Sequence, residues 1–319
     1  MATRLAILDD YQNVALESAD WGALPPDVEI TVFNEYIKGE KAVAEALSDF
    51  DIIVAMRERT PFPASLIDSL PNLKLLVTTG MRNLAIDMEA ARARGLPVCG
   101  TALLPYAAAE HAWGLILALV KQIPREDRSM HEGGWQAGFS EGLRGKTLGI
   151  VGLGKLGSQV ARVGLAFGMT LIAWSQNMTE ERAAECGATR VDKDVLFSEA
   201  DVITIHLVLS DRTRGLVGRR ELGLMKPSAY LVNTSRGPIV DEAALIETLE
   251  SRAIAGAGID VYDVEPLPRD HRLRGLDNTV LTGHTAYVMR ETYTLAYGEA
   301  VEDVRAWLAG EPVRVLNGA

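Results

Sequence analysis

Cysteine is scarce in this sequence, whose 319 residues include only Cys99 and Cys186. Two cysteines so far apart form neither the disulfide framework of a small secreted domain nor the spacing of a zinc site. Such low usage is typical of proteins that work in a reducing cytosol. We therefore expect a cytoplasmic protein with no bound metal.

Long apolar runs and an excess of basic residues are also missing. No run approaches the roughly 20 residues of a membrane-spanning helix, and the N-terminal "MATRLAILDDYQN" ends its short apolar run in two aspartates, as a strand does and a secretory signal does not. The formal net charge of −11 argues against binding to a nucleic-acid backbone. A small anionic ligand is still compatible, because local arginines can outweigh the global charge. We expect no membrane and no nucleic-acid partner.

What the sequence does contain is an alternation of short apolar runs and amphipathic stretches. With 48% apolar and 24% charged residues, the chain is long enough for two globular domains of moderate size. Near-continuous apolar strands separated by helices indicate a parallel sheet covered on both faces. In the first hundred residues the strands are expected in "RLAILDD", "EITVFNE", "DIIVAMR", "LKLLVTT" and "LPVCGT", and helices in "KAVAEALSDF", "PASLIDSL" and "DMEAARARG".

A second alternating series follows a linking region. Residues 105–122 predict a helix that is apolar nearly all round and therefore buried against another domain or subunit. The polar stretch "HEGGWQAGFSEGLRG" follows, and residues 291–310 predict a final helix. The second set of strands is expected in "KTLGIVGL", "TLIAWS", "ATRV", "DVITIHL", "AYLVNTS", "AGAGIDV" and "TVLTG". The predicted fold class is α/β, with two doubly wound parallel-sheet domains.

The stretch "TLGIVGLGKLGSQV" carries Gly152, Gly154 and Gly157 in the spacing of a dinucleotide fingerprint. The spacing alone is weak evidence, but here an apolar strand precedes it and a helix follows. The first glycine makes the tight turn, the second lets the backbone approach a pyrophosphate, and the third allows close helix packing. The alternative is a strand–turn–helix that is merely rich in glycine. The context favours a nicotinamide dinucleotide.

The residue that discriminates NAD from NADP is unusual in this sequence. The fingerprint expects a carboxylate about 20 residues after the glycines, where it holds the ribose hydroxyls. Ser175 stands there, followed by Gln176 and Asn177, so the sequence supplies neither a carboxylate nor a phosphate-binding arginine. NAD and NADP both stay open, and NADP fits better than the fingerprint alone would suggest.

Three polar residues follow expected strands of the second domain, at the edge where open α/β sheets bind ligands. They are Arg236, Glu265 and His284. Taken singly, each has an ordinary explanation as a surface arginine, a Glu-Pro turn or a structural histidine. Together they suit proton and hydride chemistry. The other histidines lack this combination and are interpreted as structural or surface groups: His111, His131, His206 and His271.

With these motifs in place, the sequence resembles the D-isomer-specific 2-hydroxyacid dehydrogenases. The resemblance covers nearly the whole chain and rests on "GLGKLGSQVARVGLAFGM", "NTSRGPIVDEAALIETL", "AGIDVYDVEP" and "NTVLTGHTA", in that order. It implies a flavodoxin-like substrate domain from residues 1–100 and 288–319, with a Rossmann dinucleotide-binding domain, residues 101–287, inserted between. It also implies a homodimer in which the helix at 105–122 is largely buried between subunits.

The resemblance assigns catalysis to Arg236, Glu265 and His284. His284 would be the proton donor in keto-acid reduction and the base in hydroxy-acid oxidation. Glu265 would fix its tautomer and favour the imidazolium, while Arg236 would hold the substrate and polarise its carbonyl. Asp260 would face the nicotinamide carboxamide. The implied cofactor contacts are Gly152, Gly154, Lys155, Leu156, Gly157, Ser175, Leu207, Thr234, Ser235, Arg236, Asp260 and His284.

The resemblance is less close at two positions. Family members usually bind the substrate carboxylate with a glycine-bearing loop, here Thr79, Gly80, Met81 and Arg82, and Arg82 stands where a second glycine is common. It is either an added anchor for an anionic substrate, together with Arg236 and His284, or an exposed loop residue. Gly283 replaces the usual proline before the histidine, which would leave His284 more mobile or change its approach. The chain also ends soon after its last helix, so we expect no serine-binding regulatory domain.

The leading hypothesis is an NAD(P)-dependent dehydrogenase that interconverts a small 2-hydroxy acid of D configuration and its 2-keto acid. Glyoxylate, hydroxypyruvate and phosphoglycerate-like compounds are all candidate substrates. Within the same fold, the alternative is a formate or phosphite dehydrogenase. A third hypothesis is a catalytically idle dinucleotide sensor of the corepressor kind, which neither the charge balance nor any tail supports.

Overall fold

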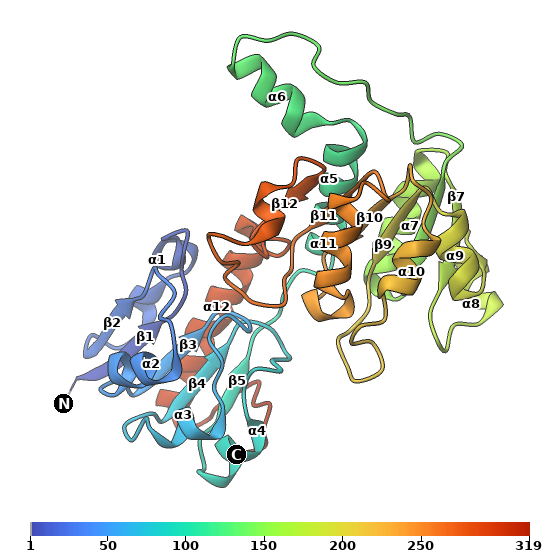
Figure 1. Cartoon of the computed structure of the whole chain (residues 1–319). Coiled ribbons are helices and arrows are strands. Elements are labelled where there is room, and N and C mark those ends of the chain that lie inside the picture. The colour runs from blue at the N-terminus through green and yellow to red at the C-terminus, as the bar shows by residue number, and fades with distance from the viewer. Residues whose placement is uncertain (1) are drawn as a thin grey trace. The chain divides into compact units, whose positions relative to one another are not determined.

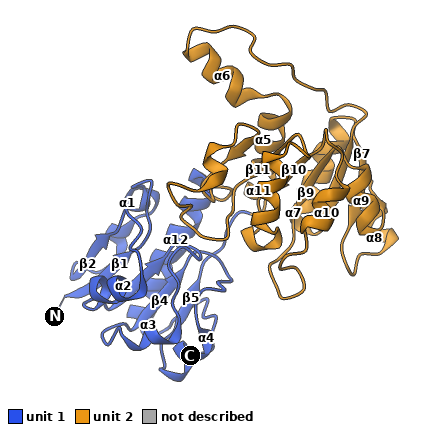
Figure 2. Ribbon diagram, viewed as in Figure 1, with its two compact units in different colours: residues 1–104, 288–319 blue, residues 105–287 orange. Residues whose placement is uncertain are grey.

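The computed structural model describes residues 2–319, which form two compact units (Figures 1 and 2). Unit 1 extends to Leu104 and resumes with Val288–Ala319, and unit 2 comprises Pro105–Tyr287. The chain thus leaves unit 1 once and returns to it. Both cysteines are free, and no helix within residues 2–319 combines the length and the apolarity that a membrane span requires.

Unit 1 is built on a sheet of five parallel strands in the order β2-β1-β3-β4-β5. Every residue of β3 and β4 is buried, as expected of strands covered on both faces. This strand order is the flavodoxin-like one. The strands are β1 Thr3–Ile7, β2 Val28–Val32, β3 Ile52–Ala55, β4 Leu75–Thr78 and β5 Val98–Gly100. The helices are α1 Ala15–Ser18, η1 Trp21–Ala23, α2 Glu40–Leu47, α3 Ala64–Asp68, α4 Met88–Ala93 and α12 Arg290–Leu308.

Unit 2 is built on a sheet of seven parallel strands in the order β12-β11-β10-β9-β6-β7-β8. Counted from β6, the order reverses beside the first strand, as it does in Rossmann folds. The strands are β6 Thr147–Val151, β7 Thr170–Trp174, β8 Thr189–Arg190, β9 Val202–Ile205, β10 Tyr230–Asn233, β11 Gly256–Ile259 and β12 Thr279–Leu281. The predicted fold class, two doubly wound parallel-sheet domains, is confirmed.

The helices of unit 2 lie on both faces of this sheet (Figure 1). They are α5 Ala107–Val120, α6 Ile123–His131, α7 Lys155–Ala166, α8 Glu180–Glu185, α9 Lys193–Glu199, α10 Arg219–Leu224, η2 Gly237–Ile239, α11 Glu242–Glu250 and η3 Arg272–Gly275. The apolar α5 packs against β10, β11, β12 and α7. Most of its apolar surface is therefore covered within its own unit, and its predicted place between two subunits stays a prediction.

The region after α5 differs from the sequence-based expectation. Where one helix was expected over residues 105–122, α5 ends at Val120, and α6 begins after Gln122, which has a φ of +54°. Pro124 lies in the first turn of α6, where its missing N–H breaks no hydrogen bond. No residue of α6 is buried, and α6 with the segment after it projects from the rest of the unit (Figure 1).

Candidate active site

The carboxyl ends of the seven parallel strands meet at one edge of the sheet in unit 2. The cofactor and catalytic residues predicted within this unit follow β6, β7, β9, β10, β11 and β12, so they gather at this edge. The edge carries the glycine turn, Ser175, Leu207, Thr234, Ser235, Arg236, Asp260, Glu265 and His284.

The glycine turn between β6 and α7 is packed too tightly for side chains at two of its three glycines. A Cβ on Gly152, whose φ is +99°, would lie 2.6 Å from the carbonyl oxygen of His206. A Cβ on Gly157 would lie 2.1 Å from the carbonyl oxygen of Gly152. A Cβ on Gly154 would meet nothing within 4 Å. The turn thus needs two glycines for its own packing, and the third leaves open space in front of the helix.

This open space fits a dinucleotide. Gly154 is the N-cap of α7 and supplies no capping side chain, so the first N–H groups of the helix, from Lys155 and Leu156 on, are available to an anion. At the same edge, the hydroxyl of Thr234 is buried with no hydrogen-bond partner within residues 2–319. A buried hydroxyl without a partner is costly unless a ligand satisfies it.

Other residues predicted to contact the cofactor make contacts within the protein. The Ser235 hydroxyl donates to the carbonyl of Ile205 at 2.7 Å, and Leu207 packs against the hydrophobic core. Ser175 is half-buried directly after β7. Arg182 Nη2 donates to the carbonyl of Leu153 at 3.4 Å, which brings one guanidinium close to the glycine turn.

The turn after β10 is tied down on both sides of Arg236. The side chain of Asn233 accepts from the N–H of Ser235 at 3.0 Å and donates to the carbonyl of Arg236 at 3.0 Å. A Cβ on Gly237 would lie 2.1 Å from the carbonyl carbon of Tyr262, so only glycine allows this close approach. The Arg236 turn therefore packs directly on the segment that leads to Glu265.

Glu265 and His284 form a hydrogen-bonded pair. The distance from His284 Nδ1 to Glu265 Oε2 is 2.6 Å, and the side chains are 19% and 34% exposed. The other carboxylate oxygen, Oε1, accepts from the N–H of Tyr262 at 2.9 Å. Glu265 is thus fixed at both oxygens and occupies the Nδ1 side of the imidazole. The opposite nitrogen, Nε2, is therefore the one that Glu265 does not contact.

The backbone of His284 is unusual, with a φ of +55°. Non-glycine residues adopt this left-handed conformation rarely and at a cost of roughly 1–2 kcal/mol. The N–H of His284 donates to the carbonyl of Asp260 at 2.7 Å, and its ring meets that of Tyr287 edge to face at 5.6 Å. A Cβ on Gly283 would meet nothing within 4 Å, so space alone does not require glycine there.

Asp260 is fully buried and supports the histidine loop, which we define as residues 282–286. Its Oδ1 accepts from the hydroxyl of Thr282 at 2.6 Å and from the N–H of Thr285 at 2.8 Å, and its Oδ2 accepts from the N–H of Ala286 at 3.0 Å. Burial raises the pKa of Asp260, but the hydrogen bonds of His111 and Thr282 outweigh burial and hold the pKa below its ordinary value. The predicted contact of Asp260 with a nicotinamide stays a prediction.

His111 joins this cluster, a position that was not predicted from the sequence. From α5, its Nε2 lies 2.9 Å from the hydroxyl of Thr282 and 3.3 Å from Asp260 Oδ1. Of the remaining histidines, His206 directly follows β9 at the same sheet edge, with its Nε2 2.9 Å from the hydroxyl of Thr204. His131 is 81% exposed beside Asp127, and His271 pairs with Glu242 at 3.1 Å.

The predicted substrate loop follows β4 in unit 1. Thr79 is fully buried, and its hydroxyl accepts from the N–H of Arg57 at 2.9 Å. The Arg57 guanidinium donates to the carbonyls of Thr79 at 3.2 Å and Arg82 at 3.4 Å. Met81 is 54% exposed, Arg82 is exposed and Gly80 is buried. Arg57 is thus a cation of this loop that the sequence interpretation missed.

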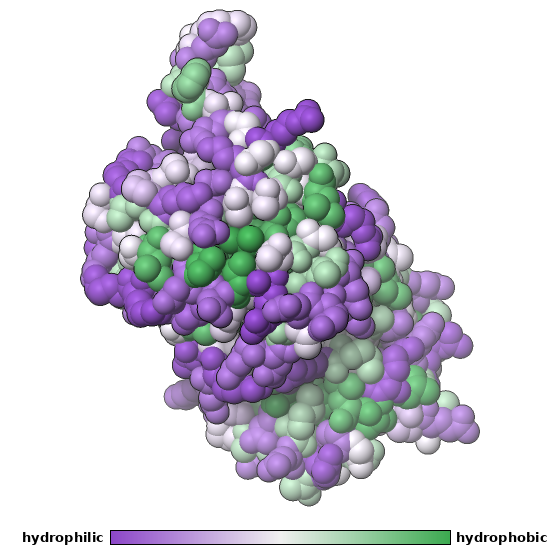
Figure 3. All heavy atoms as spheres, turned by 90° about the vertical axis from the view of Figure 1, so that its right-hand side faces the viewer, coloured by the Kyte–Doolittle hydropathy of each residue, from purple (hydrophilic) through white to green (hydrophobic). Residues whose placement is uncertain are grey.

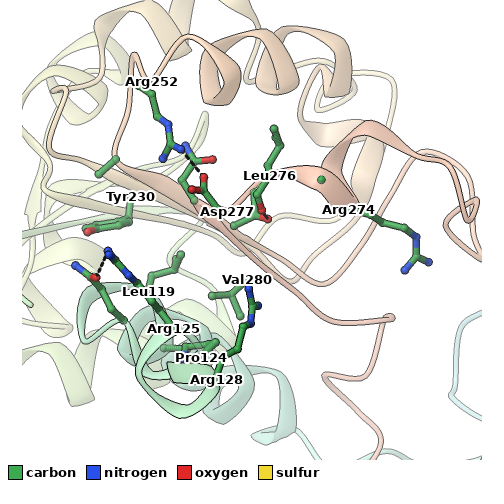
Figure 4. A pocket seen from close by; sticks show the side chains of 16 residues that line it. Leu119, Pro124, Arg125, Arg128, Tyr230, Arg252, Arg274, Leu276, Asp277 and Val280 are labelled. Atoms are coloured by element: carbon green, nitrogen blue, oxygen red, sulfur yellow. Dashed lines mark hydrogen bonds and ion pairs between the residues drawn. The ribbon is translucent and has the colours of Figure 1, made fainter. Parts of the chain in front are cut away.

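A cavity of about 580 Å³ in unit 2 lies away from the carboxyl edge. Its lining includes the first residues of β10 and β12, Tyr230 and Thr279, so it opens at the amino ends of the strands. Figure 4 shows Arg252 paired with Asp277 in its wall. Residues 2–319 contain no cluster of three or more His, Cys, Asp or Glu arranged to hold a metal ion.

Comparison with known proteins assigns this arrangement to a family. Residues 113–286 match the model of the D-isomer specific 2-hydroxyacid dehydrogenase NAD binding domain. The chain belongs to the D-isomer specific 2-hydroxyacid dehydrogenase family. The predicted family is therefore confirmed, and with it an NAD-binding domain over residues 113–286.

Individual relatives in the family agree. A glyoxylate reductase from Aeropyrum pernix is 39% identical over 263 residues, which are 79% of this chain and 78% of that protein. A D-3-phosphoglycerate dehydrogenase from Synechocystis sp. is 37% identical over 278 residues, which are 86% of this chain and 50% of that protein. The phosphoglycerate oxidoreductase structure from Vibrio cholerae O395 has a TM-score of 0.92 and 37% identity, covering 97% of this chain and 99% of that one.

The chain spans about half the length of the first curated relatives it matches, which are phosphoglycerate dehydrogenases. Family membership therefore establishes the fold and the NAD-binding domain. The substrate, the oligomeric state and the roles of individual residues are proposals.

Proposed function

We propose that this chain is an NAD(P)-dependent dehydrogenase that interconverts a small 2-keto acid and the D-2-hydroxy acid. The observation that carries the proposal is the 2.6 Å hydrogen bond between Glu265 and His284, at the same sheet edge as the glycine turn. A histidine paired through one nitrogen to a carboxylate is suited to move a proton with the other.

Each of the three residues has a separate role in the proposed reduction of a keto acid. When bound, the nicotinamide supplies the hydride that reaches the carbonyl carbon. His284 Nε2 gives its proton to the carbonyl oxygen, and Glu265 stabilises the imidazolium and fixes the ring through Nδ1. Arg236 holds the substrate carboxylate and polarises the carbonyl. In the oxidation of a hydroxy acid, neutral His284 takes up the hydroxyl proton.

The proposed cofactor site uses the glycine turn, the start of α7, and the residues after β7, β9, β10 and β11. The open space at Gly154 and the unpartnered Thr234 hydroxyl support it. Because Ser175 carries no negative charge, nothing at that position repels a 2′-phosphate, and we propose that NADPH is accepted along with NADH.

The substrate class follows from the cations and from the relatives. Arg236, in unit 2, is suited to an anionic carboxylate, whereas the guanidinium of Arg57 in unit 1 is already paired with Glu58 at 3.3 Å. The named relatives include glyoxylate, hydroxypyruvate and phosphoglycerate enzymes. We place this chain among enzymes for such two- and three-carbon acids, with the loop of residues 79–82 as a further proposed contact.

We also propose that the enzyme is a homodimer. Trp135 and Phe139, in the segment after α6, are 75% and 94% exposed. A groove of about 770 Å³ has Trp113, Leu117 and Val163 in its lining. On the face drawn in Figure 3, apolar atoms gather in patches between hydrophilic ones. Large exposed aromatic side chains of this kind are typical of a surface that another chain covers.

The experiment is a set of initial rates with NADH and NADPH over a panel of 2-keto acids, including glyoxylate, hydroxypyruvate, pyruvate and phosphohydroxypyruvate. We expect turnover with at least one of them. Formate and phosphite are assayed with NAD⁺ and NADP⁺ in parallel. Turnover confined to those two anions, or no turnover at all, would overturn the proposed function.

A further inference from the structure

The histidine loop is fastened on both sides of His284 by one buried side chain. Asp260 accepts hydrogen bonds from Thr282, Thr285 and Ala286 through its carboxylate, and from the N–H of His284 through its carbonyl. Because His284 has a left-handed backbone conformation, its ring direction depends on these bonds holding the loop in place.

His111 adds a bond to this arrangement from a different element. Its Nε2 lies 2.9 Å from the Thr282 hydroxyl oxygen and 3.3 Å from Asp260 Oδ1, and its side chain is 24% exposed. It is carried by α5, which packs with its buried side chains against β10, β11 and β12 of the same unit. The bond therefore connects the loop to a buried helix.

The protons available on the two side chains determine the direction of the hydrogen bond between His111 and Thr282. The Thr282 hydroxyl has one proton, and its 2.6 Å contact with Asp260 Oδ1 uses that proton, because an ionised carboxylate has none to give. The 2.9 Å contact must then be a donation from His111 Nε2–H to the Thr282 oxygen. The chain of bonds runs from His111 through Thr282 to Asp260, and it assigns the Nε2–H form to His111.

We infer that His111 is a positioning residue for catalysis, which acts through Thr282 and Asp260 to fix the histidine loop and the direction of the His284 ring. It touches neither substrate nor cofactor in this account. The expected effect on kcat rests on the proposed function. The expected effect on the orientation of the His284 ring does not depend on that function.

The test compares two substitutions of the same residue. His111→Leu removes the donor and retains a side chain of moderate size, whereas His111→Gln places an amide N–H near the Nε2 position. With the keto acid that the wild type reduces, we expect His111→Leu to lower kcat by between about 10-fold and 100-fold. His111→Gln should restore most of that loss. KM and the dissociation constant for NADH should change little in both.

Controls separate positioning from general damage. His131→Leu, at the exposed histidine of α6, should leave kcat and the melting temperature unchanged. Thr282→Val should reproduce the effect of His111→Leu, and the double variant should be no worse than either single one, because all three break the same chain of bonds. A kcat of His111→Leu within twofold of the wild type would overturn the inference, as would equal losses in the Leu and Gln variants.

A spectroscopic measurement tests the inference even if the proposed function fails. With ¹⁵N-labelled histidine, the ring signals of His284 should shift in His111→Leu and return toward wild type in His111→Gln. Absence of keto-acid turnover in the wild type would count against the proposed function only. His284 signals identical in all three proteins would count against the positioning role only.

Discussion

His284 is held by two acidic residues from other segments of the chain, one at its imidazole ring and the other at its backbone. Glu265 binds the ring at Nδ1, and the carbonyl of Asp260 accepts from the backbone N–H at 2.7 Å. One residue therefore orients the side chain, and the other fixes the backbone. A proton carrier needs both, because the transferring nitrogen must face the substrate within hydrogen-bond reach.

The charge of Glu265 can be tested apart from its shape. Glu265→Gln keeps the size of the side chain but removes the negative charge that stabilises the imidazolium. We expect kcat for keto-acid reduction to fall by about 10-fold to 100-fold, while NADH binding is unchanged. Steady-state kinetics and a fluorescence titration with NADH measure these two effects. Asp127→Asn, in the exposed pair with His131, is the matched control and should be neutral.

Glu265 and His284 could be predicted as site residues because both follow strands whose ends meet at the ligand edge. His111 could not be predicted, because its partners Thr282 and Asp260 are remote in sequence and no spacing links them to a residue on an apolar helix. The hydrogen bonds of the Asp260 carboxylate to the histidine loop could not be predicted for the same reason. Hydrogen bonds between distant segments leave no periodic signal.

At the scale of the elements, the glycines of the β6–α7 turn have two different roles. Two of them allow close packing, and the third faces open space that would hold a ligand. A Cβ on Gly157 would strike the carbonyl of Gly152 at 2.1 Å, whereas one on Gly154 meets nothing. We expect Gly157→Ala to lower both the melting temperature and the affinity for NADH. Gly154→Ala should keep the melting temperature and weaken NADH binding by about tenfold or more, because the methyl group occupies the space of the pyrophosphate. Unchanged NADH affinity in Gly154→Ala would contradict this assignment.

His206, which directly follows β9, should make the stability of the protein depend on pH. Burial lowers the pKa of the His206 imidazole to about 4 from its ordinary value of 6.5. As the pH falls from about 6.5 to about 4, the unfolded chain takes up a proton that the folded one does not, so the free energy of unfolding decreases. His206→Gln should remove this part of the pH dependence, whereas His131→Gln should not. Urea unfolding at pH 7 and pH 5, at one protein concentration, measures the difference.

Strands were the elements best predicted from sequence, since the central ones, such as β3, β4 and β9, are short apolar runs whose residues are all buried. The second helix of the linking region, α6, was missed because its residues bury nothing and so show no apolar face. The short α1 and η1 were missed because three or four residues are too few for a helical period to emerge.

At the scale of the whole molecule, the exposed aromatic residues after α6 give the dimer proposal its test. Phe139→Glu, alone and with Trp135→Glu, should shift the protein from dimer toward monomer in sedimentation velocity experiments, because a charge would have to be buried at the contact. Leu16→Glu, at a leucine that is 55% exposed in unit 1, is the control and should stay dimeric. A wild type that sediments as a monomer at micromolar concentration would contradict the proposal.

The fold of the chain agrees with that of its solved relatives, which include a phosphoglycerate oxidoreductase. The choice among their substrates could not be read from the sequence. It depends on side chains of loops such as residues 79–82, whose direction is set by tertiary contacts like those of Arg57.

The central claim is that His284 carries the proton in a nicotinamide-linked reduction. The most direct measurement compares initial rates of NADH oxidation, with the keto acid that the wild type uses best, in the wild type and in His284→Gln. We expect kcat to fall by about 100-fold or more while the dissociation constant for NADH stays within a factor of about two. Equal rates in the two proteins would contradict it.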